Sequence, residues 1–373
     1  MRIKIKTPSR LHFTLIDENG SIGRVDGGIG LALNTPNFTL EIANQVKINT
    51  STLNAEESGI SSNLQRVIET AMGKIHLVLK LTDCGNPDAL LDIISDVCAA
   101  FIQKIQQQFP SLNPNPFPLE MVITDFLSSH LGYGSKTQLS LAIAKGLAMF
   151  LDIDSQLDIV DLTNLVSRGG TSGIGFRAFE DGGFILDSGH RFGSGEEKTT
   201  FLPSSASNAR PARTIVRYDF PEDWWVMAVT LNVKAGASNL EEVNIFQEYC
   251  PIDIDEVRQV SHIILMQILP SIIEHNLLLL GDGIEKIQGL GFKKIEVRLQ
   301  HEDVKSLIKF QREHGAPCVG MSSFGPTVYS IFHTEAEAEK MLDLIKTEYA
   351  KTGFVYYLTK ANNRGAEIEI LED

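Results

Sequence analysis

The chain has 373 residues, a length that suggests about two domains. Hydrophobic residues make up 43% of it and charged residues 21%, the balance of a globular protein with a large core. A net charge of −14 without any cluster of basic residues argues against nucleic acid as a partner, and the longest apolar runs are far too short to span a membrane.

The cysteines and the first residues indicate the compartment. No two cysteines have the spacing of a metal site, so reduced thiols are expected rather than zinc ligands or disulfides. The first six residues alternate like a strand and lack the apolar stretch of a signal peptide. We therefore expect a cytoplasmic protein. The cysteines are Cys84, Cys98, Cys250 and Cys318.

The first 123 residues are predicted to form mainly strands. A long amphipathic helix should run from Asn86, a suitable N-cap, to about Gln108, and a proline-rich loop follows it. We predict strands at 2–7, 38–49, 74–81 and 119–123, and a second helix at 62–72.

Charged side chains and glycines are concentrated between residues 10 and 30. Arg10 and His12 have the same parity, so on an extended segment both point to one side, as do Arg24 and Asp26. Asp17 lies between the two pairs. A hairpin with solvated charges is the alternative, but these charges interrupt apolar runs among many glycines. The pattern therefore favours a functional site.

A glycine-rich loop, residues 130–137, runs directly into a helix that should end near Leu151. Its apolar residues recur on every face, which predicts a helix buried all round. Gly132 and Gly134 let backbone N–H groups approach a ligand closely. The positive end of the helix then offers a site for phosphate or diphosphate.

Three further residues of this loop support the anion-site interpretation. Ser135 or Thr137 can cap the first turn of the helix, and Lys136 adds a positive charge at the N-terminus of the helix. The loop is not a Walker A motif, because serine rather than glycine precedes the lysine. A glycine turn that only caps a core helix is the alternative interpretation.

Two more glycine-rich segments follow. The first, residues 168–177, begins with Arg168 and contains Thr171 and Ser172. The second, residues 320–327, contains Ser322 and Ser323. We expect both to meet the central loop at one site.

The remaining elements alternate between helices and strands. Residues 193–212 are rich in serine, glycine and proline and are predicted to be a loop at a domain boundary. The expected fold is α+β in two domains, 1–192 and 193–373. Helices are predicted at 155–167, 240–249, 254–276, 303–315 and 335–352, and strands at 183–187, 225–231, 328–332 and 354–359.

The three segments at 8–17, 128–136 and 320–326 resemble, in order and spacing, the three motifs of the GHMP kinase superfamily. The likeness covers essentially the whole chain. It implies an N-terminal domain like ribosomal protein S5 domain 2 and a C-terminal α+β sandwich.

A narrower resemblance is to the β-ribofuranosylaminobenzene 5′-phosphate synthase family, carried by five blocks: 10–17, 23–30, 130–135, 168–175 and 322–327. That family joins phosphoribosyl diphosphate to 4-aminobenzoate or 4-hydroxybenzoate in methanopterin biosynthesis. It releases CO₂ and diphosphate and uses Mg²⁺ without ATP. The resemblance implies small-molecule substrates and a homodimer, with neither nucleic acid nor membrane as a partner.

The reaction suggests a role for each candidate residue. Diphosphate would lie on residues 132–137 and on the turn at 322–325, with Arg24 and then Arg10 as cations for an anionic group. Asp17 or Asp26 could hold Mg²⁺ or stabilise the cationic sugar, and His12 or His130 could contact the ring substituent. Arg168, Thr171 and Ser172 complete the substrate-binding set.

Two departures from the family patterns leave alternatives open. Lys136 stands where the superfamily has a serine that helps to hold magnesium, and Gly175 stands where its kinases carry an aspartate. The missing carboxylate disfavours an ATP-dependent small-molecule kinase. The dense polar cluster at 10–26 disfavours a non-catalytic module that binds a phosphorylated metabolite.

Overall fold

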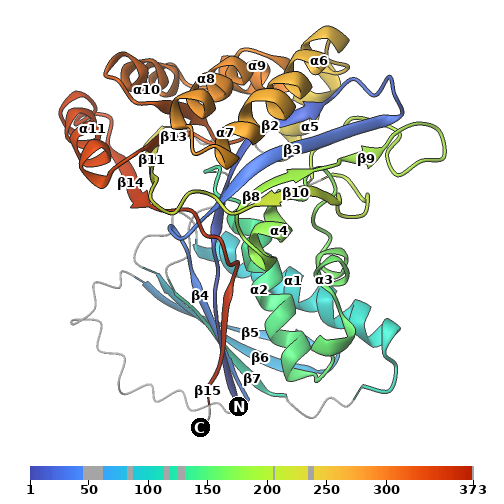
Figure 1. Ribbon diagram of the computed structural model, residues 1–373. Coiled ribbons are helices and arrows are strands. Elements are labelled where there is room, and N and C mark those ends of the chain that lie inside the picture. Colours follow the sequence, from blue (N-terminus) through green and yellow to red (C-terminus); the bar gives the residue numbers. More distant parts are fainter. Residues whose placement is uncertain are drawn as a thin grey trace.

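The computed structural model describes residues 1–44, 62–81, 87–112, 117–124, 131–204, 206–233 and 239–371 (Figure 1). Three sheets stack along the molecule, and helices pack against each of them. Both termini lie at the same end, because the last strand returns to the first. The structure confirms the predicted α+β class.

The first sheet has six strands in the order β15-β1-β4-β7-β6-β5. All neighbours are antiparallel except β6 and β7, which are parallel and therefore need the crossover supplied by helix α1. Helices α1 and α2 pack on this sheet. The bounds are β1 Arg2–Lys6, β4 Thr39–Ala43, β5 Ser62–Thr70, β6 Gly73–Leu81, β7 Leu119–Thr124, β15 Glu367–Leu371 and α1 Pro87–Gln108.

The helix predicted at 62–72 is wrong, because this segment is strand β5. Leu64 and Ile68 are four residues apart, a spacing that places them on one face of either a helix or a strand. Val67 and Ile68 are β-branched and favour the strand. Pairing with β6 along the whole hairpin, from Ser62 with Leu81 to Thr70 with Gly73, decides between the two.

The second sheet lies in the middle of the molecule, in the order β10-β8-β3-β2, with β9 also pairing with β3. Helix α4, Ile174–Glu180, packs on β2, β3 and β8 and was not predicted. Its segment is short and glycine-rich, so it carries little helical periodicity. The strands are β2 Ser9–Asp17, β3 Arg24–Leu33, β8 Phe184–Asp187, β9 His190–Arg191 and β10 Thr214–Tyr218.

The third sheet, β12-β13-β11-β14, lies under the helices of the C-terminal part. Its strands are β11 Trp225–Leu231, β12 Cys318–Met321, β13 Thr327–Phe332 and β14 Phe354–Thr359. The helices are α5 Asn239–Tyr249, α6 Ile254–Ile263, α7 Leu269–Ile273, α8 Leu277–Gln288, α9 Gly291–Arg298, α10 Glu302–Glu313 and α11 Glu335–Glu348.

Most predicted elements of this part are confirmed. The helix predicted at 254–276 is α6 and α7, joined by one π-helical turn, η3 Ile264–Ile268. In the N-terminal part, the helix predicted at 155–167 is two pieces, a 3₁₀ turn, η2 Asp154–Gln156, and helix α3, Ile159–Leu165, with extended residues Leu157 and Asp158 between them. Helices α8 and α9 were not predicted.

Helix α2, Ser135–Phe150, follows the glycine-rich loop and is buried on most sides, as predicted. The predicted cap by Ser135 or Thr137 is wrong. Gly134 is the N-cap residue in the left-handed conformation, and no side chain caps the helix. The glycine can adopt this conformation without strain, so the cap needs no hydroxyl.

Strands beyond residue 192 also complete sheets of the first half. Strand β10 pairs with β8, and β15 pairs with β1. The division into 1–192 and 193–373 therefore stays a prediction.

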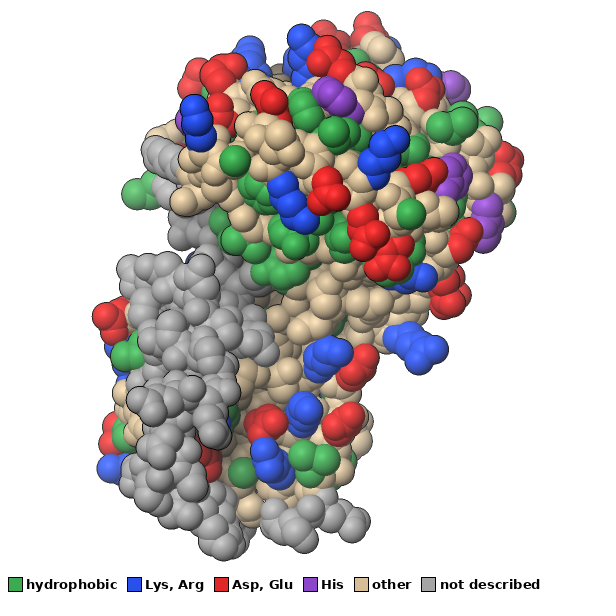
Figure 2. Space-filling view, turned by 90° about the vertical axis from the view of Figure 1, so that its left-hand side faces the viewer, with side chains coloured by type: hydrophobic (Ala, Val, Ile, Leu, Met, Phe, Trp, Pro, Cys, Tyr) green, Lys and Arg blue, Asp and Glu red, His purple; other side chains and the backbone are tan. Residues whose placement is uncertain are grey.

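Two observations concern the partners that the sequence analysis considered. Figure 2 shows acidic and basic side chains interspersed over one face of the molecule. Among the described residues, no helix has the length and apolar character needed to cross a membrane.

Candidate active site

The central loop and the third glycine-rich segment meet, as predicted. The Ser322 hydroxyl donates a hydrogen bond of 2.7 Å to the Gly132 carbonyl and accepts one of 3.0 Å from the His12 backbone N–H. The Arg10 backbone N–H in turn donates to the Tyr133 carbonyl over 3.0 Å. Strand β2, the central loop and the turn after β12 are thus tied together at one point.

Glycine is required where these loops touch. Gly132 has φ of 101°, and a Cβ there would lie 2.6 Å from the Ser322 carbonyl oxygen. A Cβ on Gly325 would lie 2.2 Å from the Leu131 carbonyl oxygen. Both distances are shorter than contact allows, so the close approach of the two loops depends on these glycines.

The first compartment of the site is a cavity of about 140 Å³, here called the anion compartment. The loop before α2 and the turn after β12 form its walls, and Arg10 and Lys136 supply two positive charges. Its lining residues are Arg10, Gly132, Gly134, Ser135, Lys136, Thr137, Glu242, Ser323, Phe324 and Gly325. The residues predicted to hold diphosphate are therefore together, except Tyr133 and Ser322, which are buried and do not line this cavity.

The second compartment is a cavity of about 180 Å³, here called the aromatic compartment. Three phenylalanines form one side of it: the Phe246 and Phe292 ring centroids lie 4.4 Å apart, and those of Phe292 and Phe324 lie 5.8 Å apart. Both compartments share Arg10, Lys136, Glu242, Ser323 and Phe324. They are therefore two parts of one cleft, suited to an anion beside an aromatic ring.

Arg10 lies on the wall common to both compartments. Its Nη1 donates a hydrogen bond of 2.6 Å to the Gly132 carbonyl, which fixes the guanidinium at the base of the loop. Burial lowers its pKa to about 10, while Glu296 and Glu242 act in the opposite direction. The side chain therefore remains positively charged at neutral pH.

His12 and three polar residues line the aromatic compartment. Burial lowers the pKa of His12 well below its usual value, and the charges of Arg10 and Lys293 act in the same direction. The ring is therefore neutral at pH 7, and its buried Nδ1 has no partner among the described residues. Arg168, Thr171 and Ser172 face the same space, as predicted.

Sequence reasoning missed two carboxylates of the cleft, Glu242 on α5 and Glu296 on α9. Glu296 accepts a hydrogen bond of 2.7 Å from the buried ammonium of Lys293. Burial raises the pKa of Glu242 to about 7, with Glu296 adding to the effect and Lys136 and Arg10 opposing it. Both residues lie on ordinary amphipathic helices with no motif, so the sequence contains no signal for them.

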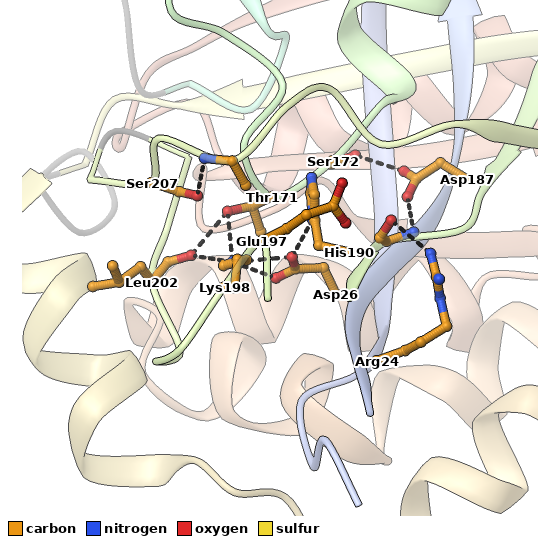
Figure 3. Close-up of polar contacts among 12 residues, drawn as sticks. Arg24, Asp26, Thr171, Ser172, Asp187, His190, Glu197, Lys198, Leu202 and Ser207 are labelled. Atoms are coloured by element: carbon orange, nitrogen blue, oxygen red, sulfur yellow. Dashed lines mark hydrogen bonds and ion pairs between the residues drawn. The ribbon is translucent and has the colours of Figure 1, made fainter. Parts of the chain in front are cut away.

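Asp26 lines neither compartment of the cleft, and its side chain lies among those of Lys198 and His190 (Figure 3). Its fully buried carboxylate accepts hydrogen bonds of 2.8 and 3.0 Å from the Lys198 ammonium and another from His190 Nδ1. The same ammonium also reaches Thr171 Oγ1 and the Leu202 carbonyl. In this structure Asp26 bonds to Lys198 and His190, and the shared Lys198 ammonium positions Thr171.

The second glycine-rich segment is held by Asp187, at the end of β8. The Asp187 carboxylate accepts hydrogen bonds from the Ser172 hydroxyl and from the Gly173 and Gly189 N–H groups. Burial raises its pKa to about 6, against the effect of these three hydrogen bonds. Its position at a strand end was a signal in the sequence for this role.

Two other predicted residues lie outside both compartments. Asp17 accepts hydrogen bonds from the N–H groups of Asn19 and Gly20 and so shapes the turn after β2. Arg24 donates to the carbonyls of Ser188 and Gly189 and lines a different cavity. Their predicted roles with substrate or Mg²⁺ remain predictions, and His130 lies outside the described residues.

Glu242 is the residue that best fits a magnesium ion. Mg²⁺ is commonly held by one or two carboxylates together with substrate phosphates. Glu242 lines the anion compartment, whereas Glu296 is already paired with Lys293. No group of three or more His, Cys, Asp or Glu side chains suited to a metal occurs in the described ranges. The donor set therefore suits a cation that arrives with a diphosphate.

Comparison with known proteins identifies the fold as that of the GHMP kinases. A family model for the C-terminal part of GHMP kinases matches residues 268–351. The mevalonate kinase of L. major, crystallised with R-mevalonate, is similar with a TM-score of 0.62 and 13% identity over 96% of each chain. The mevalonate kinase of Methanococcus jannaschii is similar with a TM-score of 0.59 and 14% identity, over 96% of this chain and 98% of that one.

Closer relatives carry a different activity in their names. Two proteins named β-ribofuranosylphenol 5′-phosphate synthase are similar along most of the chain. The one from Methanothermobacter thermautotrophicus is 41% identical over 88% of both chains. The one from Archaeoglobus fulgidus is 38% identical over 99% of this chain and 100% of its own. This chain therefore belongs to the β-ribofuranosylphenol 5′-phosphate synthase family, which has the GHMP kinase fold.

Proposed function

We propose that this protein joins phosphoribosyl diphosphate to 4-hydroxybenzoate or 4-aminobenzoate, with release of CO₂ and diphosphate, in methanopterin biosynthesis. The observation that carries the proposal is identity of 38–41% with synthases along nearly the whole chain. The two joined compartments support it, since the reaction needs an anion site beside an aromatic site. The "phenol" in the relatives' names favours 4-hydroxybenzoate of the two.

In the proposed reaction, a bond forms between C1 of the ribose and the ring carbon that bears the carboxylate. The C1–oxygen bond breaks and its electrons leave with diphosphate. The carbon–carboxylate bond then breaks, CO₂ departs, and its electron pair restores the aromatic ring. No proton or redox partner is needed for this exchange.

The anion compartment is suited to the leaving group. Backbone of Gly132–Thr137 and the charges of Arg10 and Lys136 would neutralise diphosphate as negative charge develops on it. Mg²⁺ bound at Glu242 would supply further charge neutralisation. Because a low dielectric strengthens such contacts, the partly buried position of Arg10 and Lys136 increases their effect.

The aromatic compartment is suited to the benzoate. Phe246, Phe292 and Phe324 offer apolar contacts to the ring. The unpartnered Nδ1 of neutral His12 can accept a hydrogen bond from the 4-hydroxyl group or donate one to it. Arg168 is the cation that this compartment adds, available to an anionic group of either substrate.

The kinase alternative is disfavoured by the surroundings of Gly175. This residue stands where the superfamily's kinases carry an aspartate, and a Cβ there would lie 3.1 Å from Thr137 Cγ2. Helices α2 and α4 therefore pack closely where that carboxylate would project. Among the described residues, the carboxylates that line the cleft are Glu242 and Glu296, both from the C-terminal part.

The test is a direct assay of both products. Phosphoribosyl diphosphate would be incubated with each benzoate and Mg²⁺, with and without ATP, while CO₂ and diphosphate are measured. Release of both in equal amounts without ATP is expected. Phosphate transfer from ATP without CO₂ would instead identify a kinase, and binding without turnover would identify the non-catalytic module.

Lys136→Ala is expected to weaken diphosphate binding selectively. The half-buried ammonium lies at the start of α2, and the lost contact should raise the Michaelis constant for phosphoribosyl diphosphate about five- to thirtyfold. The constant for the benzoate should hardly change. Steady-state kinetics with each substrate varied separately, at several Mg²⁺ concentrations, measures both. An unchanged constant would remove Lys136 from the anion site.

Two further expectations belong to this proposal. A cytoplasmic location is proposed from the small-molecule substrates and from the free thiols of Cys98, Cys250 and Cys318. A homodimer is proposed from the family resemblance, and sedimentation velocity of the full chain would test it.

A further inference from the structure

Arg168 is the cation of the cleft to which the reaction described above assigns no single group. Its side chain lines the aromatic compartment but not the anion compartment. Burial lowers its pKa, so the guanidinium is largely withdrawn from water. Within the described residues this guanidinium forms no ion pair and donates no hydrogen bond. A charged group that gives up water without a protein partner is unfavourable, which points to an anionic ligand.

The backbone that carries Arg168 is held from two sides. The Arg168 N–H donates to the Thr163 carbonyl over 3.0 Å, and the Ala212 N–H donates to the Gly169 carbonyl over 3.4 Å. Gly169 has φ of 83°, and a Cβ there would lie 2.9 Å from Pro211 Cβ. A cation on a backbone fixed in this way loses less conformational freedom when it binds a ligand.

The short stretch after Leu202 completes this wall of the compartment. The Thr171 hydroxyl donates to the Leu202 carbonyl over 2.8 Å, which ties this stretch to the second glycine-rich segment (Figure 3). Ser204 lines the same compartment, and its hydroxyl bonds to no other residue in the described part of the chain. The hydroxyls of Thr171 and Ser172, by contrast, already donate to other groups of the protein. Arg168 and Ser204 therefore keep donors for a ligand.

Positive charge is in excess around the aromatic compartment. Three cations and two carboxylates line it: Arg10, Lys136, Arg168, Glu242 and Glu296. The Glu296 carboxylate lies 2.7 Å from the ammonium of a further cation, buried Lys293. Burial and the charge of Arg168 lower the pKa of Lys136, whereas Glu242 acts in the opposite direction. Arg168 is thus near enough to Lys136 for one substrate to contact both.

Phosphoribosyl diphosphate has phosphate groups at two ends, so its binding needs two anion sites. The diphosphate end fits the anion compartment, whose cations are Arg10 and Lys136. The ribose C1 then lies at the wall common to both compartments, because the ring carbon attacks it from the aromatic side. The 5′-phosphate needs a cation outside the anion compartment. Among the described residues that line the cleft, Arg168 meets this condition.

The benzoate carboxylate is the other anion that could use Arg168. This carboxylate is attached to the ring carbon that attacks C1, so it belongs at the common wall, where Arg10 lies. An arginine bound to it would also stabilise the carboxylate before it leaves as CO₂, and stabilisation of the ground state slows a reaction. A guanidinium matches a phosphate with two parallel hydrogen bonds. The 5′-phosphate does not react, so it keeps this contact throughout.

We propose that Arg168 and Ser204 bind the 5′-phosphate of phosphoribosyl diphosphate, on the wall of the aromatic compartment that the anion compartment does not share. The assignment rests on the proposed function, because it names the site for one end of that substrate. Contact with a phosphate that does not react fixes the ribose so that C1 faces the ring carbon. The site therefore selects a sugar that carries a 5′-phosphate.

The test uses two probes, each of which represents one end of the substrate. Ribose 5-phosphate carries the 5′-phosphate without diphosphate, and inorganic diphosphate represents the leaving group. Titration calorimetry of the full chain with Mg²⁺ measures the affinity for each probe. Arg168→Gln should weaken binding of ribose 5-phosphate about tenfold or more and leave that of diphosphate unchanged. Lys136→Ala should do the reverse, a crossed pattern that a purely structural role would not produce.

Three further variants complete the test. Arg168→Lys keeps the charge and should recover part of the lost affinity, and Ser204→Ala should weaken ribose 5-phosphate alone. If circular dichroism shows that Arg168→Gln does not fold, these two variants decide the question. Arg258→Gln is the matched control, because it removes the same charge from an exposed position on α6 outside the cleft. It should keep both affinities.

The outcomes separate this proposal from the synthase reaction itself. No binding of ribose 5-phosphate by the wild type, or equal weakening of both probes in Arg168→Gln, would overturn the phosphate site. So would a Michaelis constant that rises for the benzoate and not for phosphoribosyl diphosphate, since Arg168 would then hold the carboxylate. The crossed pattern in a protein that releases no CO₂ would refute the synthase function and leave the phosphate site in place.

Discussion

Arg10→Gln is expected to lower kcat/KM for phosphoribosyl diphosphate about a hundredfold, equivalent to about 3 kcal/mol of transition-state stabilisation. Arg10 is the arginine common to both compartments, and its guanidinium is fixed to the Gly132 carbonyl. A preorganised charge next to the departing diphosphate acts mainly in the transition state. The fall should therefore come largely from kcat, measured with both substrates saturating.

The conservative variant separates charge from structure. Arg10→Lys keeps a positive charge in the same place and should recover part of the lost kcat, whereas a purely structural role would leave both variants equally impaired. Thermal melting of each variant checks folding, because the hydrogen bond to Gly132 also joins β2 to the central loop. Turnover by Arg10→Gln near that of the wild type would exclude the residue from the reaction.

Glu242→Gln is expected to have an effect of similar size, about a hundredfold in kcat. Its carboxylate lies on the shared wall, where a cationic ribosyl centre would form and where Mg²⁺ is proposed to bind. Burial and Glu296 raise the pKa of Glu242 to about 7, so the ionised form predominates only above that pH. The wild-type profile of kcat/KM, which reports groups of the free enzyme, should therefore rise through about pH 7, and the variant profile should lack this rise.

The free energy of unfolding should also depend on pH through the Glu242 carboxyl. Its pKa lies near 7 in the folded chain, above the ordinary value of 4.5, so the protonated carboxyl favours folding. That stabilisation is complete below pH 4.5, declines as the pH rises, and is gone above about pH 7. Glutamine does not ionise. The melting temperature of Glu242→Gln relative to wild type should therefore increase between pH 4.5 and 7 and stay constant above.

The neighbouring residue supplies a matched control for both measurements. Glu241 is exposed on the same helix and lines neither compartment. Glu241→Gln removes the same charge and should keep the wild-type kcat, the rise near pH 7 and the wild-type dependence of melting on pH. Equal losses in the two variants would indicate that the overall charge of α5, rather than a carboxylate in the cleft, is responsible.

Several features of the site could be predicted because they are local in sequence. The loop at 132–137, with its glycines directly before an apolar helix, indicates an anion site from neighbouring residues alone. Parity on an extended strand placed Arg10 and His12 on one side, and both line the cleft. Phe324, next to Ser323 in the third glycine-rich turn, lay beside a predicted residue and could have been found by the same reasoning.

Other features were decided by long-range contacts. Leu64 and Ile68 fit either a helix or a strand, and only pairing with β6 selects the strand. Asp26 and Arg24 are residue types that often occur in functional sites. In the fold, however, Lys198 bonds to Asp26, and Arg24 donates to the carbonyls of the Ser188–Gly189 turn. Nothing near them in the sequence indicates that these partners would arrive from a distant loop.

The sequence by itself determined the α+β class, the order of most elements and the three segments that meet at the cleft, because hydrophobic period and glycine-rich turns are local properties. The tertiary structure alone decided which carboxylates face that cleft and which arginines share a second cavity. Glu242 and Glu296 lie on separate helices of ordinary amphipathic pattern, and Arg24, Arg210 and Arg213 come from separate segments. Their proximity depends on how distant elements pack, which no local period encodes.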